Sequence, residues 1–260
     1  MTAHRFFLRD PLAACEPGSR VVLPLSSEDV HHLVRVLRVQ SGEEVMVVDP
    51  TGPACRVRIE TASSECVEAT VLSAQDRSQD THVTLVQGLP KGDKMDLVVE
   101  KAVEVGVEAI VPAVFERSVV SLDEQKALRR VERWRRIAEA AAKQSQRNIV
   151  PRVEELADLE RVLALVESAD AALVPWEDEA DSAPGIGAAL ESVDAKSDWH
   201  LVVVVGPEGG LTAEEVQRMR AAGGIAVSLG RTVLKSETAG ILSAALCVYV
   251  CGGLGGRPRG

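Results

Sequence analysis

The sequence predicts a small β-rich N-terminal domain followed by an α/β domain built on a mainly parallel sheet. Short alternating segments separated by turn residues fill the first 75 residues, which is typical of antiparallel strands. From Val83 onward, strand-like and helix-like segments alternate. The apolar run Val202 to Val205 then breaks directly into Gly-Pro-Glu-Gly-Gly, and a run without polar alternation suits a parallel strand buried on both faces.

The N-terminal domain is expected to be a small β-barrel with one helix. Its strands are predicted at 5–8, 20–23, 44–48, 54–60 and 66–74. Ser26 precedes Glu28 and Asp29, an arrangement that favours a helix start through capping and the helix dipole, and that helix is expected to run to Arg38. A polar stretch at 75–81 resembles a linker, so we expect domains at 1–75 and 82–260.

The elements of the second domain follow in order from hydrophobic periodicity. Strands are expected at 83–87, 109–112, 171–175, 202–205 and 225–229. Helices are expected at 93–105, closed by Gly106 in a left-handed cap, at 122–146, 156–166 and 186–193, after Thr212, and from Ile241 onward. The segment 176–187 is expected to be a surface loop.

The formal net charge of −10 argues against a protein that coats nucleic acid nonspecifically. The charge is uneven, however, because nine basic and only two acidic residues lie between Lys126 and Arg152. An acidic protein with one basic face can bind RNA locally, although a solvated helix face explains the charge equally well. The first 80 residues hold eight basic and twelve acidic residues, so any RNA surface there is expected to be small.

Other classes of protein receive little support. The nearly uncharged stretch 238–253 is shorter than the ~20 apolar residues of a membrane-spanning helix, and the first ten residues do not resemble a secretory signal. We therefore expect a cytoplasmic protein that does not insert into membranes. The five cysteines form no CxxC pair and the pair His31–His32 has no companion ligands, so no metal site is expected.

Two strand-to-loop-to-helix junctions near the C-terminus predict a ligand pocket. GPEGG follows the first strand, and Gly230 follows the second. Ligands of open α/β sheets bind at the carboxyl ends of the strands, and glycine lets the backbone approach a ligand closely. Neither GxGxxG nor a Walker loop is present, so the standard nucleotide-binding motifs are absent. The pocket argument by itself extends only to an adenine-containing ligand. Taken singly, the two segments could simply cap helices at Thr212 and Ser236.

Four ordered motifs carry a family resemblance that spans essentially the whole chain. They are LPKGDKMDLVVEKAVEVGV (89–107), AAAKQSQRNIVP (140–151), VVGPEGGLTAEE (204–215) and LGRTVLKSETA (229–239). Together they resemble the RsmE-like family of ribosomal RNA uridine N3-methyltransferases, within the SPOUT superfamily. RFFL (5–8) and HHLVRVLRVQSGEEVMVVD (31–49) resemble that family's PUA-like N-terminal domain.

The resemblance implies a SPOUT-type domain with a deep trefoil knot, a homodimer, and S-adenosylmethionine bound against the knot loops. Backbone contacts from glycines and apolar walls from leucines would hold this cofactor; the candidates are Leu173, Pro175, Gly206, Glu208, Gly209, Gly210, Leu211, Leu229, Gly230, Leu234 and Thr238. Plain core packing explains any single leucine equally well.

Methyl transfer to uracil N3 needs in-line placement, exclusion of water and removal of the N3 proton. Arg231 and Lys235 could stabilise negative charge on the uracil oxygens. Glu208 or Glu237 could accept the proton or position the substrate, while helix-dipole stabilisation is the simpler explanation for Glu237. Lys235 departs from the family pattern, in which arginine is usual, and Lys143 stands where many relatives have an acidic residue.

The N-terminal domain would position RNA. Its candidate phosphate contacts, which orient rather than specify, are His4, Arg5, Arg9, Arg35 and Arg38. In the motifs of the second domain, Lys91, Lys94 and Arg147 are further candidates for RNA binding, although exposed lysines beside a helix start explain Lys91 and Lys94 equally well. The leading hypothesis is a cytoplasmic, dimeric, S-adenosylmethionine-dependent methyltransferase that acts on N3 of a specific uridine in 16S rRNA of the small ribosomal subunit. The alternatives are a non-catalytic RNA-binding or ribosome-assembly factor that retains the fold, and an α/β nucleotide-binding enzyme with an unrelated reaction.

Overall fold

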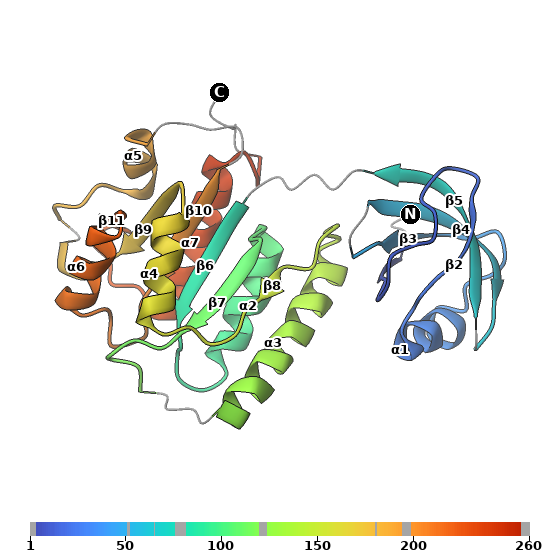
Figure 1. Ribbon diagram of the computed structural model, residues 1–260, viewed down its shortest axis with the longest axis horizontal. Helices are drawn as coiled ribbons and strands as arrows, with labels where there is room; N and C mark the ends of the chain where they lie inside the picture. Colours follow the sequence, from blue (N-terminus) through green and yellow to red (C-terminus); the bar gives the residue numbers. More distant parts are fainter. Residues whose placement is uncertain are drawn as a thin grey trace. The chain divides into compact units, whose positions relative to one another are not determined.

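The computed structural model divides the chain into two compact units. Unit 1 comprises Met1–Ser78 and Ala142–Ile149, and unit 2 comprises Gln79–Ala141 and Val150–Gly260. The structure describes residues 4–50, 53–64, 66–75, 82–119, 124–179, 181–193 and 199–255. Figure 1 shows both units.

Unit 1 is built on a five-stranded sheet in the order β1-β3-β4-β5-β2. Its strands are β1 (Arg5–Phe7), β2 (Arg20–Val22), β3 (Glu44–Val48), β4 (Ala54–Ala62) and β5 (Val67–Gln75). The β1–β3 pair is parallel and the other pairs are antiparallel. A backbone hydrogen bond of 3.2 Å from Arg9 N to Pro24 O joins the chain just beyond the two edge strands. In β4, buried residues alternate with exposed arginines, as expected for a sheet with one face on a core.

The helical segment of unit 1 covers this core. Helix α1 (Ser27–His31) continues directly into a π-helical turn at His32–Val36. Ser26 caps α1 because its Oγ accepts a hydrogen bond of 3.0 Å from Asp29 N. Leu33 is fully buried against the sheet, and Arg38 ends the segment with a left-handed φ of 54°. The predicted helix start is confirmed, and its second half is the π-helical turn.

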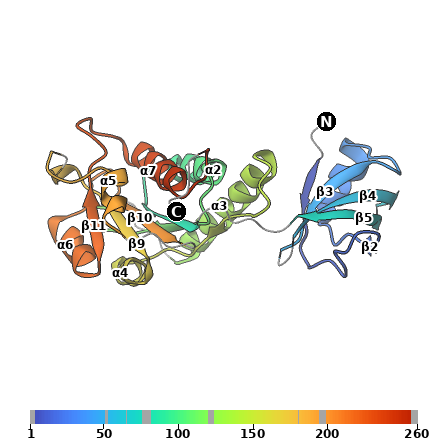
Figure 2. The same ribbon diagram turned by 90° about the horizontal axis from the view of Figure 1, so that it is seen from above.

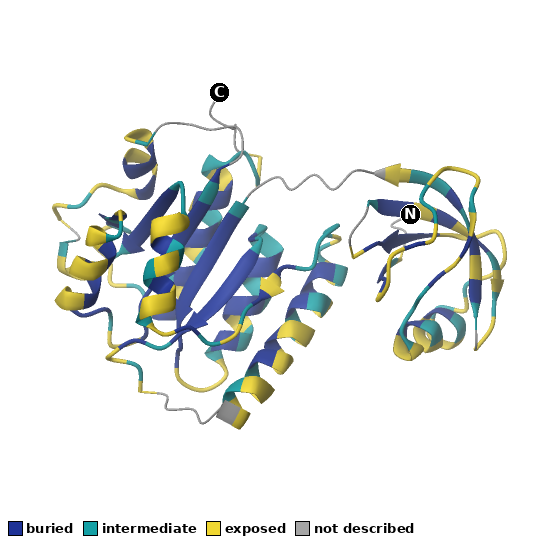
Figure 3. Ribbon diagram, viewed as in Figure 1, coloured by how far each residue is buried: buried dark blue, intermediate teal, exposed yellow. Residues whose placement is uncertain are grey.

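Unit 2 is built on a six-stranded sheet in the order β11-β9-β10-β6-β7-β8. The strands are β6 (His82–Gly88), β7 (Ala109–Ala113), β8 (Arg152–Val153), β9 (Ala171–Pro175), β10 (His200–Val205) and β11 (Gly224–Val227). All the strand pairs described in this sheet are parallel, which confirms the predicted class. The central strands β6 and β10 are buried along almost their whole length (Figure 3). The unbroken apolar run of β10 therefore reflects burial on both faces.

Helices cover both faces of this sheet. Helices α2 (Lys94–Val105), α5 (Ile186–Glu191) and α7 (Ser236–Val250) pack on one face, and α4 (Leu159–Ser168) and α6 (Ala213–Ala221) pack on the other (Figure 2). The long helix α3 (Glu124–Gln144) contacts α2, since Trp134 Nε1 donates a hydrogen bond of 3.1 Å to Asp96. Within the described residues, no helix is both long and apolar enough to cross a membrane.

Strand β8 and the start of helix α7 differ from the sequence expectation. Strand β8 is only two residues long and follows a proline, so it carries no periodic signal of its own. Helix α7 begins at Ser236 rather than near Ile241. Its first five residues, Ser236 to Gly240, include three polar residues and a glycine and so carry no apolar pattern. A helix that buries polar groups in its first turn has no apolar stripe there, and hydrophobic periodicity therefore places its start too late.

Candidate functional site

The described part of unit 2 contains a cavity of about 350 Å³ at the carboxyl edge of the parallel sheet. That volume lies at the lower end of the range of roughly 300–1,000 Å³ that is typical of small-molecule sites. The turns that follow β9, β10 and β11 line it, together with the start of α7. The lining residues are Pro175, Trp176, Glu177, Val205, Gly206, Pro207, Glu208, Gly210, Leu211, Leu229, Gly230, Arg231, Thr232, Val233, Leu234, Lys235, Ser236 and Ala239.

The turn after β10 needs glycine for steric reasons. Gly210 has a φ of +71° and donates a backbone hydrogen bond of 2.9 Å to Pro207 O, which closes the turn. A Cβ on Gly206 would lie 3.0 Å from Leu211 Cγ, so a larger residue would displace that leucine. Glycine at both positions therefore lets the backbone itself form the cavity wall.

Helix α6 starts immediately after this turn with a complete capping box. Thr212 Oγ1 accepts a hydrogen bond of 3.2 Å from Glu215 N, and Glu215 Oε2 accepts one of 2.8 Å from Thr212 N. Glu215 Oε1 also accepts a hydrogen bond of 2.8 Å from Glu116 N in the loop after β7. The helix-cap interpretation of this segment is thus correct. The capping contacts join the turn to α6 and to the loop after β7, so the same segment can both cap a helix and line the cavity.

The loop after β11 supplies most of the opposite wall. Gly230 has a φ of +97°, and its vacant Cβ position faces open space among the described atoms. Arg231 is 92% exposed and forms a 3.5 Å ion pair with Asp181, itself 85% exposed. Such an exposed pair contributes little to stability, so Arg231 remains able to bind another anionic group.

A lysine on α2 connects two carboxylates beside the cavity. Lys94 Nζ lies 2.9 Å from Glu208 Oε1 and 3.5 Å from Glu237 Oε2. Lys91 N donates a further hydrogen bond of 2.9 Å to Glu208 Oε1. The contact with Glu237 is an attraction between charges without hydrogen-bond geometry, since Glu237 Oε2 is buried and accepts no hydrogen bond.

These contacts shift two pKa values in opposite directions. Partial burial alone would raise the pKa of Glu208, but the Lys91 amide and the Lys94 ammonium together outweigh it and the pKa falls below the ordinary value. The hydrogen bond to Glu208 raises the pKa of Lys94. Glu208 is therefore ionised at neutral pH and is a poor proton acceptor there.

The structure brings most of the sequence-predicted cofactor and catalytic residues to the cavity. Ten line it: Pro175, Gly206, Glu208, Gly210, Leu211, Leu229, Gly230, Arg231, Leu234 and Lys235. Four do not. Leu173 is fully buried within β9, and Gly209 O accepts a hydrogen bond of 3.1 Å from Arg117 on the outer side of the turn. Glu237 and Thr238 lie in the first turn of α7 without lining the cavity.

Sequence reasoning missed the contribution of the turn after β9. Trp176 and Glu177 were expected in a surface loop, yet both line the cavity. Glu177 Oε1 would lie 2.7 Å from a Cβ on Gly210, so the two turns touch. The available signal was positional, since these residues directly follow a buried parallel strand just as Gly206 and Ser228 do.

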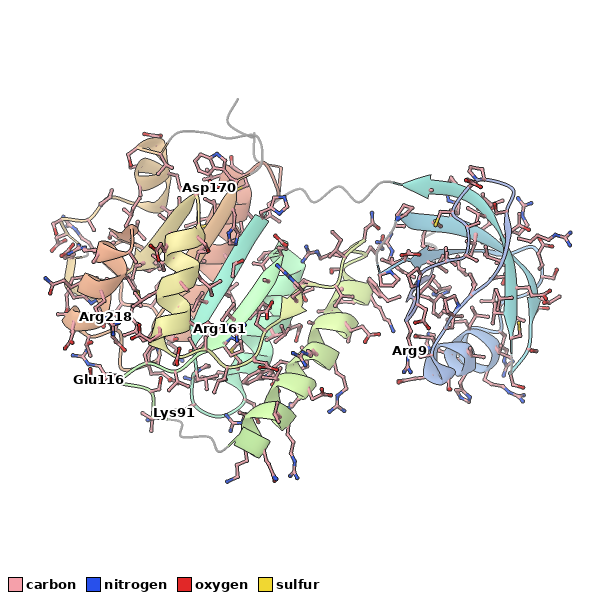
Figure 4. All side chains as sticks on the ribbon, viewed as in Figure 1. Arg9, Lys91, Glu116, Arg161, Asp170 and Arg218 are labelled. Atoms are coloured by element: carbon pink, nitrogen blue, oxygen red, sulfur yellow. The ribbon has the colours of Figure 1, made fainter. Side chains whose placement is uncertain are left out.

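The residues predicted to bind RNA divide between the units. In unit 1, Arg9, Arg35 and Arg38 are exposed. Arg5 is half-buried, hydrogen-bonds Gln146 O and donates 2.9 Å to Asn148 Oδ1, and burial lowers its pKa. Arg147 also belongs to unit 1, in the segment 142–149. In unit 2, Lys91, labelled in Figure 4, has an exposed side chain in the loop after β6, while Lys94 is engaged with the two carboxylates.

The described residues contain no group of three or more His, Cys, Asp or Glu side chains placed to hold a metal ion.

The chain matches two family models. Residues 77–248 match the RNA methyltransferase domain, and residues 25–72 match the RNA methyltransferase PUA domain. The first match alone covers more than half of the chain, and it contains all the residues that line the cavity.

Named relatives agree with these models. The chain is 33% identical to the Ribosomal RNA small subunit methyltransferase E of Bacillus subtilis, over 86% of this chain and 89% of that protein. It is 32% identical to the protein of the same name from Aquifex aeolicus, over 84% of this chain and 90% of that one.

Solved structures show the same fold. A crystal structure of a Ribosomal RNA small subunit methyltransferase E from Neisseria gonorrhoeae, bound to S-adenosyl methionine, matches with a TM-score of 0.76 and 32% identity over 94% of this chain and 96% of that one. A putative methyltransferase from Legionella pneumophila in complex with SAM matches with a TM-score of 0.75 and 25% identity over 95% and 97%. From its sequence and its fold alike, the chain belongs to the RNA methyltransferase family of the ribosomal RNA small subunit methyltransferase E proteins.

Proposed function

We propose that this protein is an S-adenosylmethionine-dependent methyltransferase that methylates N3 of a specific uridine in 16S rRNA of the small ribosomal subunit. The carrying observation is the backbone-lined cavity at the carboxyl edge of the parallel sheet, formed by the two motifs that resemble the uridine N3-methyltransferase family. The names of the relatives support the RNA substrate, and the S-adenosyl methionine bound to one structural neighbour supports the cofactor.

The residues present fit S-adenosylmethionine. Its adenine requires hydrogen-bonding groups between apolar walls, and the cavity offers the main chain of Gly206, Gly210 and Gly230 beside Leu211, Leu229 and Leu234. Gly210 and Gly230 both have positive φ, so their peptide groups adopt orientations that other residues would resist. The carboxylate of Glu177 gives the wall a negative charge that suits the positive sulfonium and amino groups of this cofactor.

The bound cofactor supplies an activated methyl group, so the protein has to place uracil N3, exclude water and stabilise charge. Arg231 and Lys235 line the cavity and are exposed enough to meet a uracil whose oxygens become negative as N3 loses its proton. Glu208 is bound by Lys91 and Lys94, and we assign it to holding the turn rather than to accepting that proton. Glu237 is attracted to Lys94 by charge alone, at 3.5 Å, and its place in the first turn of α7 also favours a negative charge.

Unit 1 is proposed to position the RNA, as its match to a PUA domain model suggests. Exposed Arg9, Arg35 and Arg38 are suited to phosphate contacts, which orient an RNA without reading its bases. Arg5 and Arg147 remain candidates, with Arg5 already holding the segment 142–149 within unit 1. We keep 1–75 and 82–260 as the functional division of the chain.

The protein is further proposed to act as a homodimer in the cytoplasm. Leu97 of α2 and Leu242, Leu246 and Tyr249 of α7 are 38% to 54% exposed, on two helices that pack together. The three α7 residues are spaced four and three apart and so share one helix face. A second copy of this chain would cover that apolar face.

We also propose the trefoil knot that the family resemblance implies. The chain leaves the edge strand β11, runs along the carboxyl edge of the sheet and returns to pack α7 against β10 and β6. That return path, with Ser228 N bonded to Pro184 O at 2.9 Å, is compatible with a chain that passes through its own loop.

Three measurements test the function. Isothermal titration with S-adenosylmethionine should show saturable binding, and tritium should pass from the labelled methyl group into small subunits from a strain lacking this protein. Mass-spectrometric mapping of rRNA from that strain should show one missing N3-methyluridine. Binding without transfer to RNA would instead favour a non-catalytic assembly factor. The absence of both donor binding and a missing mark would refute the proposal.

A further inference from the structure

Three segments of the chain pack next to the cavity so closely that two of the contacts leave no room for a Cβ atom. They are the end of β6, the turn after β10 and the start of α7. A Cβ on Gly88 would lie 2.4 Å from Pro207 N, and a Cβ on Gly240 would lie 2.0 Å from Gln87 Oε1. Neither clash could be relieved without moving a backbone or a buried side chain, so glycine at both positions is what permits this approach.

A chain of hydrogen bonds crosses this junction. Gln87 Nε2 donates to Ser236 Oγ at 2.9 Å, and Ser236 Oγ donates to Gly206 O at 2.6 Å. Gln87 is fully buried and Ser236 is 7% exposed. The carbonyl of Gly206 can only accept, so the hydroxyl must donate to it and the amide must donate to the hydroxyl. The second amide hydrogen of Gln87 bonds Gly88 O at 3.1 Å.

The Gly206–Pro207 peptide, which accepts the last of these hydrogen bonds, has no hydrogen-bond donor. Pro207 has no N–H, so the carbonyl of Gly206 is the hydrogen-bonding group of the Gly206–Pro207 peptide. Ser236 therefore sets the orientation of a peptide that lines the cavity. The same contact holds the start of α7 against the turn after β10.

Gln87 occupies an unfavourable environment. Its Oε1 is buried without a hydrogen-bond partner among the described atoms, and a buried acceptor of this kind destabilises the folded state. An apolar side chain of similar size would avoid that cost. The feature that such a side chain could not reproduce is the hydrogen bond donated to Ser236.

We propose that Gln87 and Ser236 are positioning residues for the methyl donor: they hold the Gly206–Pro207 peptide and the start of α7 in the arrangement that binds it. This inference rests on the proposed function. Gln87 does not line the cavity, so any effect of this residue on donor binding is indirect, through Ser236 or through the adjoining Gly88 that packs against Pro207.

The first test replaces Ser236. Ser236→Ala leaves two buried polar groups unsatisfied and should raise the Kd for S-adenosylmethionine about 10-fold to 100-fold in isothermal titration, with kcat at saturating donor little changed. Ser236→Thr keeps the hydroxyl and should restore binding. Ser243→Ala is the matched control, because Ser243 is also buried in α7 and its Oγ has no partner among the described residues.

The second test concerns the Gln87–Ser236–Gly206 hydrogen bonds, called the relay below. It separates the effect of the relay on donor binding from direct contact with the donor and from an effect on folding. Gln87→Met retains the size of the side chain and should weaken donor binding with little change in Tm. Gly240→Ala alone should lower both Tm and affinity by displacing Gln87. Adding Gln87→Ala to Gly240→Ala should restore Tm but leave affinity at the level of Gln87→Ala.

The outcomes distinguish this inference from the proposed function. If the wild type binds S-adenosylmethionine and the Ser236→Ala and Gln87→Met variants bind it equally well, the relay has no positioning role. Affinity that simply follows Tm across all variants, Ser243→Ala included, would also overturn it. A wild type that binds no donor would refute the proposed function instead.

Discussion

Lys94 and Glu208, 114 positions apart in the sequence, form a 2.9 Å hydrogen bond that joins the start of α2 to the turn after β10. The contact places a cation next to a carboxylate at the edge of the cavity, and Glu237 lies within 3.5 Å of the same ammonium group. One lysine thus connects the three segments that follow β6, β10 and β11.

Removing Lys94 should loosen the cavity. Lys94→Met leaves Glu208 and Glu237 close together without their shared cation, so we expect weaker S-adenosylmethionine binding by calorimetry. Lys101→Met is the matched control, since Lys101 lies on the same helix and pairs with Glu100 and Glu104 away from the cavity. If the two variants bind S-adenosylmethionine with equal affinity, Lys94 does not contribute to donor binding.

The Lys94–Glu208 contact should also depend on pH. The pKa of Glu208 is depressed, so its contribution is present above the ordinary carboxyl value of 4.5 and is lost as pH falls through the lower folded-state value. The pKa of Lys94 is raised, so its contribution is complete below 10.5 and is lost only as pH rises beyond that. The Tm difference between wild type and Glu208→Gln should therefore be constant near neutrality and shrink in acid. A difference that persists unchanged at pH 3 would contradict this assignment.

Arg231 and Lys235 are expected to act on the RNA base. If they stabilise charge on the uracil oxygens, alanine at either position should lower kcat roughly 10-fold or more while the Kd for the donor changes little. Arg218→Ala serves as the control, because Arg218 pairs with Glu160 on the outer surface of unit 2 (Figure 4). Equal losses in kcat and in donor affinity would reassign the two cations to cofactor binding.

Gly230 tests the requirement for positive φ without a steric clash. A methyl group there meets open space, so Gly230→Ala should cost only the backbone strain of about 1–2 kcal/mol and lower Tm by a few degrees. Donor affinity should fall as well if the peptide at this position faces the cofactor. Gly187→Ala is the control, because Gly187 lies in helix α5 and its Cβ position also faces open space. This variant should leave donor affinity unchanged and leave Tm unchanged or slightly raised.

The proposed dimer can be tested on α7. Leu246→Glu places a charge on the apolar face shared with Leu242 and Tyr249 and should yield a monomer in sedimentation velocity. Leu128→Glu provides the comparison, because Leu128 of α3 is 50% exposed and lies outside that face. Should both variants sediment like the wild type, the second copy does not bind there.

Local sequence determined much of this fold. The unbroken valines of β10, the left-handed Gly106 after α2 and the Thr212–Glu215 capping box each depend on residues a few positions apart. Periodicity and capping are properties of such short windows, so they could be predicted without a structure. The same reasoning brought Gly206, Gly230 and Lys235 to a common cavity, because parallel strands end at one edge.

The tertiary structure alone decided which distant residues meet. Gln87 and Ser236 lie 149 positions apart, and Leu173 and Trp176 differ in access to the cavity although they share one strand and its turn. These relationships follow from the strand order β11-β9-β10-β6, which sets β6 directly beside β10 and returns α7 across both. A hydrogen bond between segments so far apart leaves no periodic trace in either one, because its geometry depends on packing rather than on neighbours in the chain.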